Sequence, residues 1–408
     1  MLAGDSSDRQ SFTSLAAVWE SDISAGLNNK LALGQMQKRQ SSRIGSAGRV
    51  TLDSTTTYLR QQLLLAVGKS HELTLGASAQ STLLDVDLDF KYPRCTEFDP
   101  NCDISSAPRL LSRQAVRQNA ADLYVNERWQ FDAQWTAIAG LRLSRDAYLR
   151  HTALEPRLGL EWAWSAQTTL SAGLGKHNQA PDLDQSLAQI GNPKLKPLQS
   201  THAVLGLTQS LSQGWSWRVE VYAKQFDNYA VADPVLNYRN GASGQARGVE
   251  LLVRKEAVGP WSGFASLSLS RARRQIDATG ENFPFDFDQP VIANVVGQYK
   301  LSDRWQFGAR WSYHTGSPYT PVVGTGLYPD GRVRPLYGSI NSQRVPAYHR
   351  LDLRADAKFT PRFTGYVDLI NAYGRKNVSG YSYSADYRTR EEIRQFPLFP
   401  SLGIKYTF

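Results

Sequence analysis

The chain has 408 residues, a formal net charge of +9 at neutral pH, 11% aromatic residues and a mean hydropathy of −0.42. No segment approaches the roughly 18 consecutive apolar residues that a membrane-spanning helix needs, so the sequence excludes a helical membrane protein. The modest positive charge comes without a basic run or a recognition helix, which argues against nucleic-acid binding. A transmembrane β-barrel remains open, because its strands alternate apolar and polar residues and its aromatic girdles are rich in Tyr, Trp and Phe.

Alternation with a period of two predicts strands along the whole chain. Trp217, Val219 and Val221, for example, alternate with Arg218 and Glu220. Because successive side chains of a strand point to opposite faces, each such run has one apolar face and one charged face. This pattern predicts roughly 17 strands. In chain order they lie at 12–19, 27–37, 47–67, 72–90, 112–127, 134–148, 155–164, 168–177, 199–211, 215–227, 246–256, 261–274, 290–300, 304–315, 348–359, 363–371 and 400–408.

The links between the predicted strands alternate in length. The short ones lie at 165–167, 211–214, 257–260, 301–303 and 360–362, and the long ones at 178–198, 275–289, 316–347 and 374–399. Short periplasmic turns and long extracellular loops are typical of bacterial outer-membrane barrels. A soluble β-sandwich has no reason to sort its loops by side, and its strands are shorter, typically about 5–6 residues. The sequence therefore predicts an all-β fold, an antiparallel transmembrane β-barrel of the outer-membrane type.

Seven short segments in the later part of the chain carry a resemblance to a known family. They are Leu154–Leu160, Ser171–Gly175, Gly191–Pro197, Arg247–Leu251, Tyr348–Arg354, Asp368–Asn371 and Pro400–Phe408. In order and spacing they resemble the barrel strands of TonB-dependent receptors, including a final strand that ends on an aromatic residue. The resemblance covers residues 154–408.

This resemblance implies an organisation and a function. Such receptors have about 22 strands, of which roughly 16–17 are present here, together with a plug inside the barrel and a segment that engages an energy-coupling protein. We expect residues 1–408 to form a partial receptor barrel without a plug domain. The N-terminus lacks the charged start and apolar core of a signal peptide, so we also expect the chain to be a fragment or to have a misassigned start.

The expected function is that of a receptor and transporter barrel in the outer membrane of a Gram-negative bacterium. It would serve energy-coupled uptake of a scarce ligand, such as a ferric siderophore or another large nutrient. The expected partners are outer-membrane lipid, that small or medium-sized ligand and, through the missing N-terminal part, a TonB-type energy-coupling protein. The alternative is a passive, porin-like channel of about 16 strands that closes on itself.

An enzyme is not expected, because no Ser/His pair on neighbouring strands suggests a catalytic site. We also expect no cofactor and no metal site. Asp85, Asp87 and Asp89 share one face of a predicted strand. They could bind calcium, but we interpret them as carboxylates of the lumen or rim.

Two groups of residues are the candidates for specific roles. Cys95 and Cys102 lie close together in a loop and predict a small disulfide in an oxidising compartment. Ligand contacts should come from the long loops, because binding residues collect on loops held by a rigid scaffold. The loop 316–347 is the first candidate, ahead of 178–198 and 374–397. Its aromatic and cationic residues are Tyr319, Tyr328, Arg332, Arg334 and Tyr337.

Overall fold

One long antiparallel sheet forms most of the molecule. The computed structural model describes residues 5–93, 95, 103 and 106–407, and among these the main sheet has 18 strands. They are β1 (Ser6–Ser24), β2 (Leu27–Ile44), β3 (Gly48–Val67), β4 (His71–Lys91), β5 (Arg109–Gln130), β6 (Trp135–Asp146), β7 (His151–Ala163), β8 (Thr168–Gln179), β9 (Leu198–Ser210), β10 (Trp215–Asp233), β11 (Asn237–Lys255), β12 (Trp261–Ile276), β13 (Asn282–Pro284), β14 (Val291–Lys300), β15 (Trp305–His314), β20 (Tyr348–Lys358), β21 (Phe363–Ile370) and β24 (Phe399–Tyr406).

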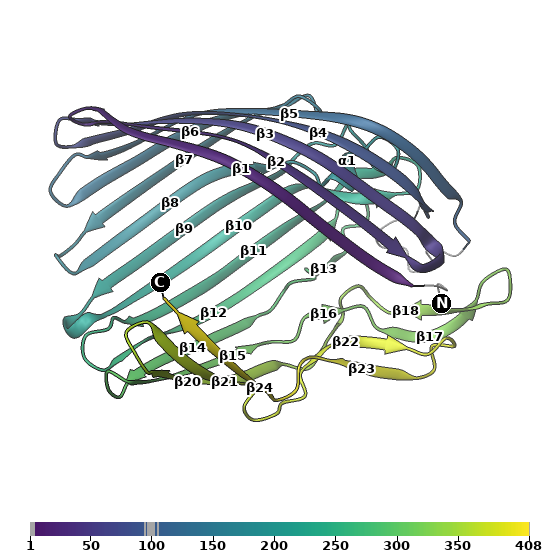
Figure 1. Ribbon diagram of the computed structural model, residues 1–408. Helices are drawn as coiled ribbons and strands as arrows, with labels where there is room; N and C mark the ends of the chain where they lie inside the picture. The colour runs from purple at the N-terminus through teal and green to yellow at the C-terminus, as the bar shows by residue number, and fades with distance from the viewer. Residues whose placement is uncertain (1–4, 94, 96–102, 104–105, 408) are drawn as a thin grey trace.

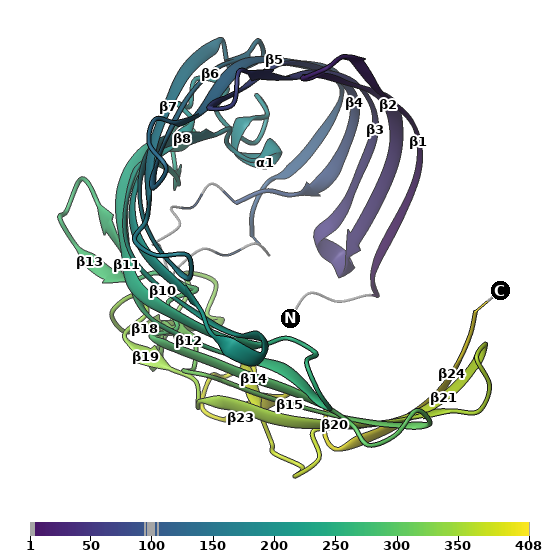
Figure 2. The same cartoon turned by 90° about the vertical axis from the view of Figure 1, so that its left-hand side faces the viewer.

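The sheet is a meander that curves round into a barrel wall. Each strand from β1 to β12 pairs with the next, the order continues through β14, β15, β20, β21 and β24, and β13 is a short addition to β12. All seventeen predicted strands are thereby confirmed, one for one. Within the described part of the chain β1 and β24 do not pair with each other, and they lie at the two free ends of the curved wall (Figure 2).

The long links hold small elements that alternation did not predict. They are α1 (Leu183–Ser186), β16 (Pro318–Tyr319), β17 (Val322–Leu327), β18 (Val333–Tyr337), β19 (Gln343–Arg344), β22 (Val378–Tyr383) and β23 (Arg390–Arg394). Here β16 pairs with β19, β17 with β18, and β22 with β23. These elements gather at one end of the wall, and the short turns lie at the other (Figure 1). No helix in the described ranges is long and apolar enough to span a membrane.

The inner face of the wall is fixed by the segment that contains α1. This segment lies inside the curve (Figure 2). Leu187 and Ile190, just after α1, pack in one buried cluster with Leu84, Val86 and Leu88 of β4. These β4 residues therefore face inward, and the alternate residues of β4 face outward.

The outward face is apolar over a continuous band. Direct cross-strand partners run from Leu160 through Ala172, Leu205 and Val221 to Val249 and Leu269, across six strands. Leu205 keeps 64% of its surface exposed and Val221 keeps 49%, because none of the described residues covers them fully. The opposite face carries charges that pair with one another, such as Arg218 with Glu220 at 2.6 Å. The wall thus has an apolar exterior and a polar interior.

Aromatic rings mark the short-turn end of the wall. A chain of rings runs from Trp129 through Phe131 to Trp135, Trp162 and Trp164, with centroid separations between 5.2 and 6.5 Å. Trp261 and Tyr299 continue this arrangement farther round the wall, at 4.4 Å.

The sequence left two positions open for the β4 carboxylates, the lumen and the rim. Asp85, Asp87 and Asp89 do not line the lumen, because Val86 and Leu88 occupy the inner face of β4. They lie on the outward face near the long-loop end, where Asp89 pairs with Arg109 at 2.6 Å and Asp87 with Arg113 at 2.9 Å. The segment that contains α1 packs against an apolar inner surface here. In this part of β4 the apolar side chains therefore face inward and the charged ones outward, the opposite of the arrangement in the rest of the wall.

Candidate functional site in the long loops

The loops 316–347 and 374–397 meet through aromatic and cationic side chains. The Tyr319 ring lies 5.1 Å from that of Tyr381. Arg390 donates to the Tyr319 hydroxyl at 3.1 Å and lies 4.1 Å above the Tyr381 ring. A guanidinium over a ring face is attracted by the quadrupole of the ring. These three residues therefore join the two loops, and we call them the tyrosine–arginine junction.

A second group forms around Arg332 at the tip of the β17–β18 hairpin. Its guanidinium donates to Asp330 at 2.6 Å and also to Asp103, which belongs to a different loop. These hydrogen bonds, that to Asp103 first, raise the pKa of Arg332 above its usual value. The Tyr328 ring lies 5.2 Å from the Arg332 guanidinium. Burial, and then the charge of Asp103, raises the pKa of Tyr328. Two segments that are distant in sequence thus meet at Arg332.

Arg334 and Tyr337 complete the predicted set. Arg334 donates to the carbonyl oxygen of Leu327 at 3.2 Å, across its own hairpin. Burial raises the pKa of Tyr337, and the neighbouring phenols of Tyr387, Tyr328 and Tyr383 raise it further. Those phenols must lie near Tyr337 to exert this effect, so Tyr337 is part of the same surface.

Four residues on this surface were absent from the predicted set, although their loop ranked as a further candidate. They are Tyr381, Tyr383, Tyr387 and Arg390. Their signal in the sequence is the dense recurrence of Tyr between 381 and 387, followed by Arg390. Asp103 could not have been found from its sequence position, because its contact with Arg332 spans 229 residues.

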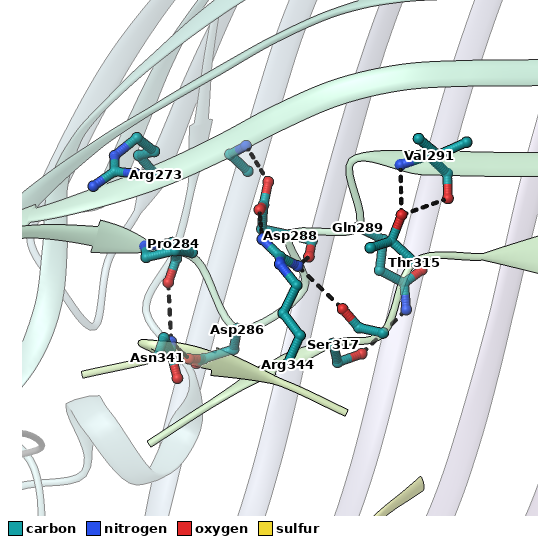
Figure 3. Close-up of polar contacts among 12 residues, drawn as sticks. Arg273, Pro284, Asp286, Asp288, Gln289, Val291, Thr315, Ser317, Asn341 and Arg344 are labelled. Carbon is teal, nitrogen blue, oxygen red and sulfur yellow. Dashed lines mark hydrogen bonds and ion pairs between the residues drawn. The ribbon is translucent and has the colours of Figure 1, made fainter. Parts of the chain in front are cut away.

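A buried polar network fastens the loop 316–347 to the wall (Figure 3). Arg344 forms an ion pair with Asp288 and donates to the Gly316 carbonyl at 3.1 Å. The Asp288 side chain is only 6% exposed and also accepts from the Ala272 amide at 2.6 Å. Asn341 donates to the Pro284 carbonyl at 2.9 Å. A desolvated charge needs such partners, so this network fixes the base of the loop.

The loop 178–198, which ranked next to these two loops, is placed differently. Leu187 is 1% exposed and Ile190 is 9% exposed, both against the inner wall. Tyr148 donates to the Ser186 carbonyl at 3.1 Å. This loop covers the wall and adds no residue to the tyrosine–arginine junction.

The second predicted feature, the disulfide, stays a prediction. Cys95 is described, but Cys102 lies outside the described residues. The arrangement of phenols and guanidiniums at the loops suits an anionic or aromatic ligand, since such groups donate hydrogen bonds and stack. Among the residues that the structure describes, no three His, Cys, Asp or Glu side chains are grouped so that they could hold a metal ion.

Known proteins share this architecture. The family model described as "TonB dependent receptor-like, beta-barrel" matches residues 3–375. The chain belongs to the TonB-dependent receptor family. The match covers most of the chain, including residues 3–150, which lie outside the part that showed the sequence resemblance.

Solved structures agree with this fold. The pyoverdine outer membrane receptor FpvA from Pseudomonas aeruginosa PAO1 has a TM-score of 0.73 at 15% identity, covering 99% of this chain and 62% of that one. The siderophore receptor PirA from Acinetobacter baumannii has a TM-score of 0.73 at 14% identity, covering 98% and 63%. The outer membrane transporter YddB from Escherichia coli has a TM-score of 0.73 at 12% identity, covering 99% and 64%. This receptor barrel therefore spans less than two thirds of the length of these structures.

Proposed function

We propose that this receptor barrel spans the outer membrane of a Gram-negative bacterium with its long loops outside the cell. The exposed apolar band from Leu160 to Leu269 supports the membrane placement, because in water it would leave a large apolar surface without cover. The rings from Trp129 to Trp164 also support the membrane placement, since aromatic girdles lie at membrane interfaces. The short turns at the same end support the orientation, since short turns face the periplasm.

The barrel serves, in this proposal, the energy-coupled uptake of a scarce ligand, a ferric siderophore or another large nutrient. The tyrosine–arginine junction carries the proposal, because phenols and a cation from two loops converge at the mouth of the barrel. The ligand contacts are assigned to Tyr319, Tyr328, Arg332, Arg334 and Tyr337, joined by Tyr381 and Arg390. Coupling to a TonB-type protein requires a plug and a coupling segment, and no such domain occurs among the described residues.

Ligand binding tests this proposal directly. The refolded chain is titrated with an iron(III) catecholate and with an iron(III) hydroxamate, and tryptophan fluorescence reports the bound fraction. Tyr319→Ala combined with Arg390→Ala should weaken binding of the preferred complex by roughly tenfold or more, since one hot-spot truncation costs about 2 kcal/mol. Arg388→Ala on the same loop is the matched control, because its side chain is 83% exposed and contacts only Asp386, at 3.9 Å. Equal binding by all three proteins would refute the assignment.

A passive porin-like channel is the second candidate, favoured only by the number of strands. It requires a closed wall, whereas β1 and β24 are not paired with each other within the described residues. Unpaired strand edges are costly in lipid, because water cannot satisfy their backbone groups. Conductance across a planar bilayer separates the two candidates. Large, steady openings of the isolated chain would favour the channel.

A further inference from the structure

The outward face of the wall changes character towards the long loops. On β7 to β12 the outward face is apolar along the band from Leu160 to Leu269. On β1 to β6, towards the long-loop end, eight exposed arginines face outward, against four aspartates. The arginines are Arg9, Arg39, Arg43, Arg49, Arg109, Arg113, Arg117 and Arg145, and the aspartates are Asp53, Asp85, Asp87 and Asp89. The long-loop end therefore carries excess positive charge on its exterior, in contrast to the aromatic short-turn end.

Two pairs of outward arginines, one on β2 and β3 and one on β11 and β12, lie directly opposite each other across neighbouring strands. Arg43 of β2 is the cross-strand partner of Arg49 of β3, and Arg247 of β11 is the partner of Arg271 of β12. Like charges directly opposite each other in a sheet are destabilising. Within the described residues Arg43, Arg247 and Arg271 have no acidic partner. Arg49 differs, because it forms an ion pair with Asp87 at 3.8 Å and has Asp89 as its cross-strand partner on β4. An anion between the two guanidiniums would remove this repulsion.

The pair on β11 and β12 also borders an apolar groove. Arg247 and Arg271 stand one outward row above Val249 and Leu269, which are themselves cross-strand partners. Together with Val221 they line a groove of about 500 Å³ on the exterior. A phosphate at the top and a hydrocarbon chain below would match this order of charged and apolar surface, since arginine binds phosphate oxygens in a bidentate manner.

We infer that Arg247 and Arg271 form a binding site for the phosphate group of a membrane lipid whose acyl chain occupies the groove over Val221, Val249 and Leu269. This inference rests on the proposed placement in the outer membrane and goes beyond ligand uptake. It makes the outer rim of the barrel a lipid-phosphate surface.

The test compares two lipids that differ only in the phosphate. The chain is reconstituted in phosphatidylcholine nanodiscs that contain a small fraction of either dioleoyl phosphatidic acid or dioleoylglycerol. Native mass spectrometry then counts the retained lipids. The wild-type chain should retain phosphatidic acid selectively, and Arg247→Gln combined with Arg271→Gln should weaken this retention by roughly thirty-fold, given the contribution of each basic residue at an anionic lipid surface. Arg218→Gln combined with Arg254→Gln removes the same charge from the inner face of β10 and β11 and should leave retention unchanged.

Each other outcome decides against the inference in a distinguishable way. Equal retention of the two lipids, or unchanged retention in the Arg247/Arg271 variant, would overturn it while the barrel still inserts. Displacement of the lipid by excess inorganic phosphate would assign the pair to a free anion and also overturn it. A chain that folds but inserts into no bilayer would remove the proposed membrane function as well.

Discussion

Two of the long loops leave the barrel wall differently and are held by different kinds of contact. The loop 178–198 turns inward and buries Leu187 and Ile190 against Val86 and Leu88. The loop 316–347 instead extends as hairpins and meets the loop 374–397 through polar contacts at Tyr319 and Arg390. Apolar burial fixes the first loop as part of the wall, whereas the second keeps exposed phenols and cations available for a ligand.

The largest effect is expected from a substitution that detaches the loop 316–347 at its base. Asp288→Ala leaves Arg344 without its partner in a poorly solvated position, which we expect to destabilise the base of the loop by about 3–5 kcal/mol. Hydrogen exchange in 316–347 should rise sharply, while exchange in 178–198 stays as it was. Asp303→Ala, at a short-turn residue whose side chain is 99% exposed, serves as the control. Unchanged exchange across 316–347 would mean that the Asp288 network does not hold the loop.

A core truncation tests the other side of the contrast. Leu187→Ala removes a side chain that is 1% exposed, and we expect a loss of about 2–3 kcal/mol from the inner cluster. Exchange should then rise in 178–198 and in the facing part of β4, not in the hairpins. Leu327→Ala, at a residue that is 66% exposed, is the matched control and should change little. A comparable effect of both variants would show that burial does not distinguish the two loops.

The contact between the hairpins should give a smaller effect. Arg390→Gln removes the cation over Tyr381 and the charged donor to Tyr319, both at exposed positions, so we expect a loss of about 1 kcal/mol. Spin labels on β17 and β22 should report a broader distance distribution, with no change in the thermal midpoint of the wall. Arg388→Gln should leave the distribution as in the wild type. A narrow distribution in the Arg390 variant would exclude a bridging role.

The sequence allowed the wall to be predicted because alternation is local, and every predicted strand is present. Alternation did not predict the strands in the loops. β17 and β22 pair with strands of their own loops and do not follow the apolar–polar pattern of the membrane-spanning strands. The candidate loop 316–347 was identified from its composition, but its partners Tyr381 and Arg390 depend on long-range packing. For Asp85 the sequence left the lumen and the rim open for the same reason, because only the docking of Leu187 shows which face of β4 is internal.

Acid should loosen the hairpins before it affects the inner loop. Hydrogen bonds, from the Arg332 side chain to Asp330 and from the Ser384 side chain to Asp386, come first in lowering the pKa of each carboxyl below its usual 3.8. A lowered pKa means that these contacts stabilise the hairpins above pH 3.8 and are lost as the pH falls through the lower, folded-state value. The cluster around Leu187 and Val86, as the structure describes it, contains no carboxylate and should keep its order over the same range. Spin-label distances measured from pH 7 down to pH 2 would follow this directly, with Asp330→Asn removing part of the transition. Loosening of 178–198 at the same pH would mean that carboxylates stabilise this loop as much as they stabilise the hairpins. The distinction between an apolar and a polar loop would then be wrong.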